Sequence, residues 1–183
     1  MKRWIKWTAG AVGIVGAVAL FVVPKAATSA LPVGAKAPDF TTRGALAGKV
    51  FTLTLSDQLK KGPVVLYFFP AAFTPGCTAE AREFAEATDR FRAAGATVIG
   101  MSADPVDKLA KFSVQECRNK FAVASAGPAV IKDYDVALPV GGMTNRTSYV
   151  IAPTGRVAYV HSAMSYKDHV KNTLAAVESM KAR

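Results

Sequence analysis

With 183 residues the chain can form one ordinary domain with a sizeable core, but not two domains of usual size. A formal net charge of +10 raises nucleic acids and acidic membranes as partners, yet the basic residues are scattered and no aromatic platform interleaves them. We therefore expect a solvated basic surface and no nucleic-acid binding. Two cysteines, Cys77 and Cys117, are too few for a disulfide scaffold, and their spacing matches no zinc site.

Residues 1–30 have the layout of an export signal. A basic start precedes an uncharged apolar run over residues 7–23, which Pro24 and Lys25 interrupt before several small residues. The run is longer than a usual signal core and slightly short for a transmembrane span, so cleavage after Ala30 and retention as a membrane anchor both stay open. In both cases we expect the lysines to stay in the cytoplasm and the following domain to be periplasmic, tethered to the membrane only if the segment is uncleaved.

Strand and helix patterns alternate along the rest of the chain. Residues 64–69 are a continuous β-branched, aliphatic and aromatic run bounded by Pro63 and Pro70, which is typical of a strand buried on both faces. The other expected strands are 49–55, 96–102, 121–125, and a hairpin of 147–151 and 157–160. The expected helices are 56–60, 77–93, one that starts at Asp104-Pro105, 129–134 and 167–181. This order predicts an α/β, thioredoxin-like fold with a central mixed sheet flanked by helices.

Cys77 lies where the buried strand has ended and a helix begins. Free backbone N–H groups and the positive end of the helix dipole favour an anion there, and the thiolate is the nucleophilic form of cysteine. A free cysteine is more often an inert core residue, but a proline-rich turn between strand and helix is an unusual place for one. We therefore predict that Cys77 is a reactive thiol.

The spacing Pro70-x-x-x-Thr74-x-x-Cys77 resembles the active-site signature of the peroxiredoxins. Three more segments resemble, in the family's order, its entry segment, its arginine-bearing strand and its closing helix: 33–40, 145–151 and 166–174. The likeness covers the chain from about residue 31 to the end and is greatest to the bacterioferritin-comigratory, or peroxiredoxin Q, branch. It implies one thioredoxin-like peroxiredoxin domain over residues 31–183.

This resemblance implies a thiol peroxidase that reduces hydrogen peroxide and organic hydroperoxides. Cys77 is then the peroxidatic residue, and Pro70 shields its thiolate from water. The Thr74 hydroxyl bonds the sulfur or a peroxide oxygen, although the same hydroxyl can also cap the helix. The family likeness selects Arg146 as the guanidinium that stabilises the developing oxyanion, a choice that sequence physics alone leaves open between Arg146, Arg82 and Arg118.

Three further polar residues have ordinary explanations as well. Glu80 resembles a family glutamate, but the helix dipole also accounts for a carboxylate in the first turn. His161 and His169 are isolated in the sequence, and we interpret them as surface or packing residues. We expect neither a metal nor a cofactor.

The second cysteine departs from the commonest family pattern. Many peroxiredoxin Q members carry a resolving cysteine five residues after the peroxidatic one, where this chain has Arg82. Other members place it on the following helix, where Cys117 lies. We therefore expect Cys117 to resolve the Cys77 sulfenic acid as an intramolecular disulfide, with a buried bystander as the open alternative. A thioredoxin-like dithiol would then reduce the disulfide of a monomeric enzyme.

Two other functions stay open. An exported thioredoxin-like thiol-disulfide protein without peroxidase activity depends on Cys-x-x-Cys, and Thr74 occupies the first position here. A non-catalytic holdase or binding module on the same fold needs no reactive thiol, so an unmodified Cys77 after peroxide treatment would favour it.

Overall fold

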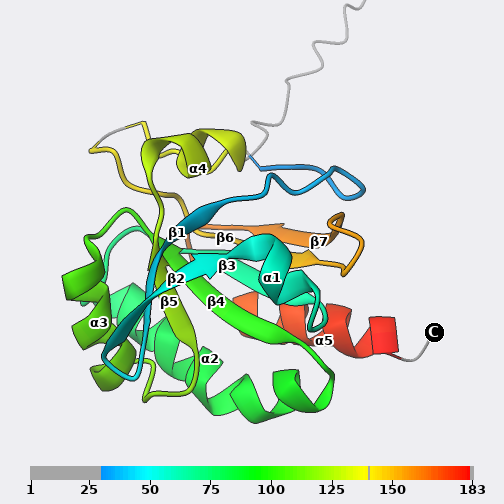
Figure 1. The fold of residues 1–183 in the computed structure, drawn as a ribbon, viewed down its shortest axis with the longest axis horizontal. Helices are drawn as coiled ribbons and strands as arrows, with labels where there is room; N and C mark the ends of the chain where they lie inside the picture. The colour runs from blue at the N-terminus through cyan, green and yellow to red at the C-terminus, as the bar shows by residue number, and fades with distance from the viewer. Residues whose placement is uncertain (1–29, 140, 182–183) are drawn as a thin grey trace, which may run out of the picture.

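The computed structural model describes residues 30–139 and 141–181, and all but one residue of the predicted signal or anchor over residues 1–30 lies outside them. The described residues contain a seven-stranded sheet in the order β2-β1-β5-β4-β3-β6-β7 (Figure 1). The strands are β1 (Thr41–Leu46), β2 (Lys49–Thr54), β3 (Val64–Phe68), β4 (Thr97–Ser102), β5 (Ala122–Ser125), β6 (Thr147–Ile151) and β7 (Val157–Ser162). The helices are α1 (Leu55–Leu59), α2 (Pro75–Ala93), α3 (Val106–Gln115), α4 (Pro128–Asp133) and α5 (His169–Lys181).

Strand β3 lies in the interior of the sheet, between β4 and β6. It runs parallel to β4 and antiparallel to β6, in a register that sets Phe68 opposite Thr147. All five residues of β3 are buried, because successive side chains point to opposite faces and both faces are covered. The sheet is therefore mixed and flanked by helices on both sides, which confirms the predicted fold class.

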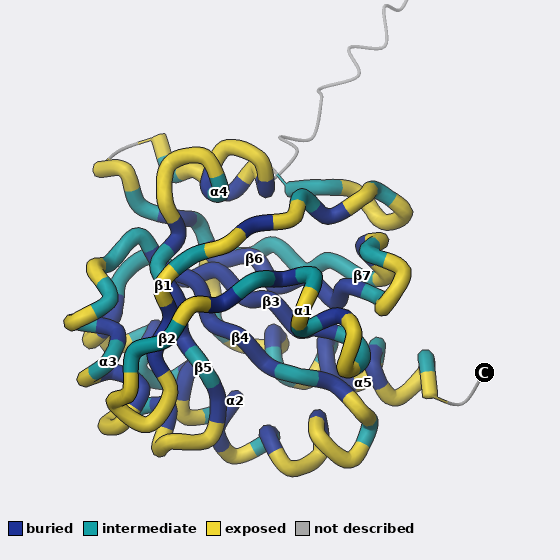
Figure 2. The backbone as a smooth tube through the Cα atoms, in the orientation of Figure 1, coloured by how far each residue is buried: buried dark blue, intermediate teal, exposed yellow. Residues whose placement is uncertain are grey.

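Two apolar clusters pack on the two faces of the sheet. One joins Val65 and Tyr67 of β3 to α2, α3 and α5 and contains both cysteines. The other joins Leu66 and Phe68 to α1 and α4. Figure 2 shows the inner strands buried, while exposed positions gather on the outer sides of the helices and at the β1–β2 end of the sheet. Among residues 30–139 and 141–181, no helix is both long and apolar enough to cross a membrane.

The structure corrects the expected elements in three places. Strand β1 was not predicted, because its sequence TTRGAL neither alternates nor is rich in β-branched apolar residues. Its Gly44 permits close packing, since a Cβ there would lie 3.3 Å from the Cβ of Ala124. Pro105 is the residue before α3 and not its first residue, and Cys117 lies just past the end of α3.

Candidate active site

The peroxidatic candidate lies in the first turn of α2. Helix α2 begins at Pro75 after Thr74, and Cys77 is its third residue. The Cys77 side chain is buried, with 1% of its surface exposed, and its thiol is free. The strand-to-helix turn thus places a single sulfur at the positive end of a 19-residue helix, where an anion is favoured.

The turn before α2 is held by a carboxylate that follows β4. Asp104 Oδ2 accepts hydrogen bonds from the backbone N–H of Ala72 at 2.6 Å and from the Ser102 hydroxyl at 2.8 Å. Lys108 Nζ lies 2.7 Å from Asp104 Oδ1. Burial opposes ionisation of Asp104, but the bonds from Lys108, Ala72 and Ser102 outweigh it and lower its pKa. From the sequence, Asp104 was expected only at the start of a helix. Because β3 and β4 are parallel, their C-terminal ends lie at the same edge of the sheet, which brings Asp104 close to the turn after β3.

A second anchor comes from the segment before β6. The Thr144 hydroxyl donates to the carbonyl of Phe69 at 2.7 Å, and Thr144 is fully buried. This bond fixes the backbone immediately before Pro70, which is half-buried as the chain leaves β3. The turn between β3 and α2 is therefore fixed by two contacts, one from the segment after β4 and one from the segment before β6.

Arg146, selected by resemblance, is the arginine that the structure places beside Cys77. Its Nη2 lies 3.4 Å from Cys77 Sγ, its Nη1 donates to Glu80 Oε2, and its Nε donates to the Met164 carbonyl at 3.0 Å. The side chain is 6% exposed, so these interactions act away from bulk water.

The Thr74 hydroxyl bonds within its own turn and does not cap the helix. Its Oγ1 donates to the carbonyl of Ala71 at 2.9 Å, and the side chain makes no capping hydrogen bond to α2. The capping alternative is therefore wrong. Thr74 is exposed, so its hydroxyl is accessible from solvent.

Glu80 is more than a dipole-neutralising surface residue. Its side chain is fully buried and pairs with Arg146, although Glu80 Oε1 has no hydrogen-bond partner. Burial, opposed in part by Arg146, raises the pKa of Glu80 to about 8. The burial of Glu80 could not be expected from the sequence, because its partner Arg146 lies 66 positions away.

His169 is a buried residue, as the packing interpretation expected, but it packs behind the site. Its Nδ1 lies 2.8 Å from the Ser148 hydroxyl and 3.7 Å from Glu80 Oε1, and its Nε2 lies 3.0 Å from the Ala163 carbonyl. Burial lowers the pKa of His169 to about 4. The His161 ring centroid lies 4.5 Å away. Among the described residues no group of three or more potential ligands is arranged to hold a metal ion.

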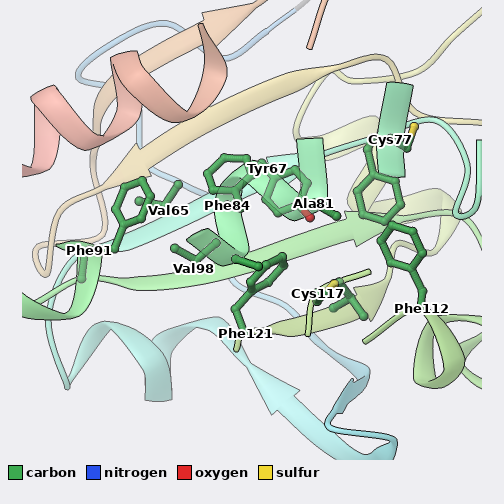
Figure 3. Packing of buried hydrophobic residues seen from close by; sticks show 14 of the residues in the cluster. Val65, Tyr67, Cys77, Ala81, Phe84, Phe91, Val98, Phe112, Cys117 and Phe121 are labelled. Carbon is green, nitrogen blue, oxygen red and sulfur yellow. The ribbon is translucent and has the colours of Figure 1, made fainter. Parts of the chain in front are cut away.

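Cys117 is also buried and free, but its surroundings are apolar. It belongs to the same cluster as Tyr67, Phe112 and Phe121. Burial raises the pKa of Cys117 far above the ordinary value. Figure 3 shows Cys77 and Cys117 at different places in this cluster, with Phe121 close to Cys117. Neither cysteine takes part in a disulfide, a bond that requires Cα separations of about 4.4–6.8 Å.

Three ion pairs connect α2 to the turn that contains Cys117, and we call them the ion-pair clasp. They are Arg82–Glu116 at 2.8 Å, Glu86–Arg118 at 3.3 Å and Asp89–Lys120 at 3.2 Å. The turn is tight, because Arg118 and Asn119 both have positive φ angles, 49° and 59°. The arginines that sequence physics could not exclude, Arg82 and Arg118, therefore serve this clasp and not the Cys77 sulfur.

An apolar depression of about 170 Å³ adjoins Arg146. Its walls include Leu138, Pro139, Ala163 and Met164, and 56% of Met164 is exposed. A substrate that reaches the guanidinium from this side would meet apolar surface, which suits an organic group better than water.

The sequence and the fold both have known relatives. Residues 33–160 match the model of the AhpC/TSA family. A chloroplastic peroxiredoxin Q of Oryza sativa subsp. japonica is 32% identical over 149 residues, 80% of this chain and 67% of the relative. The crystal structure of peroxidoxin BcpB from Mycobacterium tuberculosis is similar at a TM-score of 0.74 and 33% identity, covering 82% of this chain and 98% of that chain. A reduced 2-Cys peroxiredoxin of Plasmodium vivax shares the fold at a TM-score of 0.73 and 22% identity, covering 82% and 96%.

Proposed function

The chain belongs to the AhpC/TSA family, in its peroxiredoxin Q branch, and is a thiol-dependent peroxidase; from this premise we propose that Cys77 attacks the hydroperoxide. The observation that supports this most is the 3.4 Å approach of Arg146 Nη2 to Cys77 Sγ. The guanidinium and the helix start put positive charge where a cysteine nucleophile would react.

The first step breaks the O–O bond of the peroxide. The Cys77 thiolate bonds to the terminal oxygen of ROOH and becomes the sulfenic acid Cys–SOH, while RO⁻ leaves and is protonated to ROH. Arg146 offers fixed N–H donors to the oxygen on which charge develops. Thr74 re-aims its hydroxyl at the peroxide, and Pro70, which has no N–H, leaves no backbone donor to bring water to the turn.

The second step joins the two cysteines. The Cys117 thiol condenses with the Cys77 sulfenic acid, forming an S–S bond and releasing water. The burial of both sulfurs in one cluster supports this pairing, and their separation requires the start of α2 or the turn after α3 to unfold locally. A thioredoxin-like dithiol then reduces the disulfide and is itself oxidised, which returns both thiols.

The substrates are hydrogen peroxide and organic hydroperoxides, and the enzyme acts as an exported monomer. The depression beside Arg146 supports organic substrates, and the pattern of residues 1–30 supports export with or without cleavage. Cell fractionation tests the export: full-length protein that remains in the cytosol with residues 1–30 attached would contradict it, and replacement of residues 1–30 by Met should confine active enzyme to the cytoplasm.

Peptide mass spectrometry after one equivalent of peroxide tests the chemistry. Reduced wild-type protein should give a Cys77–Cys117 disulfide within one chain and no covalent dimer. Accumulation of Cys77 sulfenic acid with free Cys117 would make this a one-cysteine peroxidase. An unmodified Cys77 would reject its peroxidatic role.

A further inference from the structure

Phe73, in the turn before α2, has an unusual backbone conformation for an aromatic residue. Its φ angle is 69°, in the left-handed region that favours glycine, and 40% of its surface is exposed. A bulky residue at such a φ angle is strained and persists only where its surroundings hold it. Its own burial is too incomplete to account for this, so its contacts with neighbouring elements hold the conformation.

The ring of Phe73 contacts an aromatic residue of α3. Hydrogen bonds fix the residues on either side of Phe73. Its ring meets that of Phe112 edge-on, with centroids 5.2 Å apart and an interplanar angle of 88°. An edge-to-face arrangement is favourable for an aromatic pair. We call this contact between Phe73 and Phe112 the aromatic latch.

Phe112 also holds Cys117. Its carbonyl accepts the backbone N–H of Cys117 at 3.1 Å and that of Glu116 at 2.9 Å. Its ring is fully buried and stacks on Phe69, just after β3, with centroids 5.5 Å apart. Phe112 and both cysteines belong to the apolar cluster drawn in Figure 3. One residue of α3 therefore contacts the turn before Cys77 through its ring and Cys117 through its carbonyl.

We propose that the aromatic latch keeps Cys117 buried until the turn before Cys77 opens. Phe73 lies four positions before Cys77, so unfolding of the start of α2 takes the Phe73 ring away from Phe112. The end of α3 then loses a contact that holds it in place and releases Cys117 more readily. Phe73 is thus a positioning residue for disulfide formation, a role that rests on the proposed functions of Cys77 and Cys117.

The ion-pair clasp does not provide the same connection. Its members on α2 all lie beyond the first turn of that helix: Arg82, Glu86 and Asp89. The clasp therefore stays paired when only the first turn of α2 unfolds, whereas the aromatic latch breaks. The strained φ angle of Phe73 acts in the same direction, because the turn relaxes as it opens.

Thiol labelling of the reduced protein tests the aromatic latch without peroxide. In full-length Cys77→Ser protein, Cys117 is the single thiol, and because it is fully buried an aromatic disulfide reagent such as DTNB reaches it only after opening. Adding Phe73→Ala should speed this labelling about twofold to tenfold, the range expected for loss of an aromatic pair. Val114→Ala, which truncates an exposed apolar residue of α3, is the matched control and should leave the rate unchanged. An unchanged rate in Phe73→Ala would overturn the proposal.

Phe73→Gly separates the aromatic latch from a general loss of stability. Both Phe73→Gly and Phe73→Ala lose the ring, but glycine adopts a positive φ angle without strain, so the turn before Cys77 should open less often in Phe73→Gly. In a Cys117→Ser background, Cys77 should therefore be labelled more slowly in Phe73→Gly than in Phe73→Ala. Labelling of Cys117 should be equally fast in both variants, because the ring is missing from both. If the two variants differ at Cys117 as they do at Cys77, Phe73 contributes stability alone and the proposal is wrong.

The same variants with both cysteines present connect the aromatic latch to peroxide chemistry. After one equivalent of hydrogen peroxide, the Cys77–Cys117 disulfide should form faster in Phe73→Ala, by a factor similar to that for labelling of Cys117. Faster labelling with a wild-type rate of disulfide formation would reject the role of Phe73 in the second step. Faster labelling with no disulfide in any variant would reject the proposed function of Cys117 and leave the aromatic latch in place.

Discussion

Cys77 and Cys117 are buried in the same apolar cluster, yet their polar neighbours differ. Cys77 has the guanidinium of Arg146 at 3.4 Å and lies at the start of a long helix. Cys117 lies among aromatic rings, and burial raises its pKa. Burial therefore does not distinguish the two sulfurs, whereas the cation held beside Cys77 does. In the proposed mechanism the first step uses this organised site, and the second requires Cys117 to leave its surroundings.

Exchanging either sulfur for oxygen gives the largest expected effect. Cys77→Ser should abolish peroxide consumption, because the nucleophile is lost. Cys117→Ser should react once at the wild-type rate and then stall as a sulfenic acid that over-oxidises readily. Stopped-flow oxidation followed by mass spectrometry distinguishes these outcomes. Continued turnover in Cys77→Ser would reverse the assignment of the two cysteines.

Replacing Arg146 should leave the Cys77 sulfur without a neighbouring guanidinium, as the Cys117 sulfur is. We expect Arg146→Ala to slow the oxidation step by one to several orders of magnitude, because a preorganised donor to a developing oxyanion is often worth about 3–4 kcal/mol. Arg90→Ala is the matched control, since Arg90 is exposed and pairs with Glu178 on α5. Single-turnover rates that are equal in the two variants would contradict the role of Arg146.

The buried acid and base behind Cys77 predict a pH dependence of stability. Because the folded pKa of Glu80 is raised from 4.5 to about 8, its contribution is present below 4.5 and lost as pH rises through 8. The folded pKa of His169 falls from 6.5 to about 4, so its contribution is present above 6.5 and lost as pH falls through 4. The two slopes oppose each other between pH 4.5 and 6.5, and of these two residues only Glu80 contributes a slope between pH 6.5 and 8.

Denaturant unfolding of reduced protein should show this asymmetry. The free energy of unfolding of wild type should fall between pH 6.5 and 8 by up to about 1.4 kcal/mol per pH unit, and Glu80→Gln should remove most of that slope. His169→Gln should extend the fall to below pH 6.5, because the opposing contribution is gone. A wild-type curve that rises over pH 6.5–8 has the wrong sign for a raised Glu80 pKa.

A smaller effect is expected at the apolar depression beside Arg146. A charge at Met164 would make its wall polar, so Met164→Asp should lower kcat/KM for cumene hydroperoxide roughly threefold to tenfold more than for hydrogen peroxide. The ratio of the two substrates is the measurement, because a general disturbance lowers both values equally. If the ratio of the two kcat/KM values is unchanged, the depression does not contact the organic substrate.

The smallest expected effect concerns the ion-pair clasp, which connects α2 to the turn that contains Cys117. Arg82→Ala removes one ion pair of the clasp and should speed disulfide formation about twofold to fivefold, since partly exposed pairs contribute about 0.2–1 kcal/mol. Raising the salt concentration should reduce the difference between variant and wild type. Lys60→Ala, which breaks an exposed pair on α1, is the control. A slower second step in Arg82→Ala would mean that the clasp assists the encounter.

The parts of the site that depend on sequence neighbours were predictable, and those that depend on folding were not. The buried run, the proline turn and the helix start of Cys77 lie within a few residues of one another. Arg146 lies 69 positions from Cys77, and only the family resemblance selected it. The contacts of Asp104 with Ala72 and of His169 with Glu80 had no local signal, because each joins residues that are far apart in the sequence. Strand β1 escaped prediction because its neighbours, not its composition, make it a strand.

The register of β6 has a consequence for how this site can change. Ser148 reaches His169 of α5, and Val150 packs in the cluster of α2, while Tyr149 and Ile151 pack on the opposite face. Arg146 therefore reaches Cys77 because it stands an even number of positions from Ser148 and Val150. An insertion of one residue within β6, with the rest of the strand kept in register, would turn the guanidinium to the other layer and put Thr147 in its place. Substitutions can tune this site gradually, whereas a change in the length of β6 removes Arg146 from Cys77 in one step.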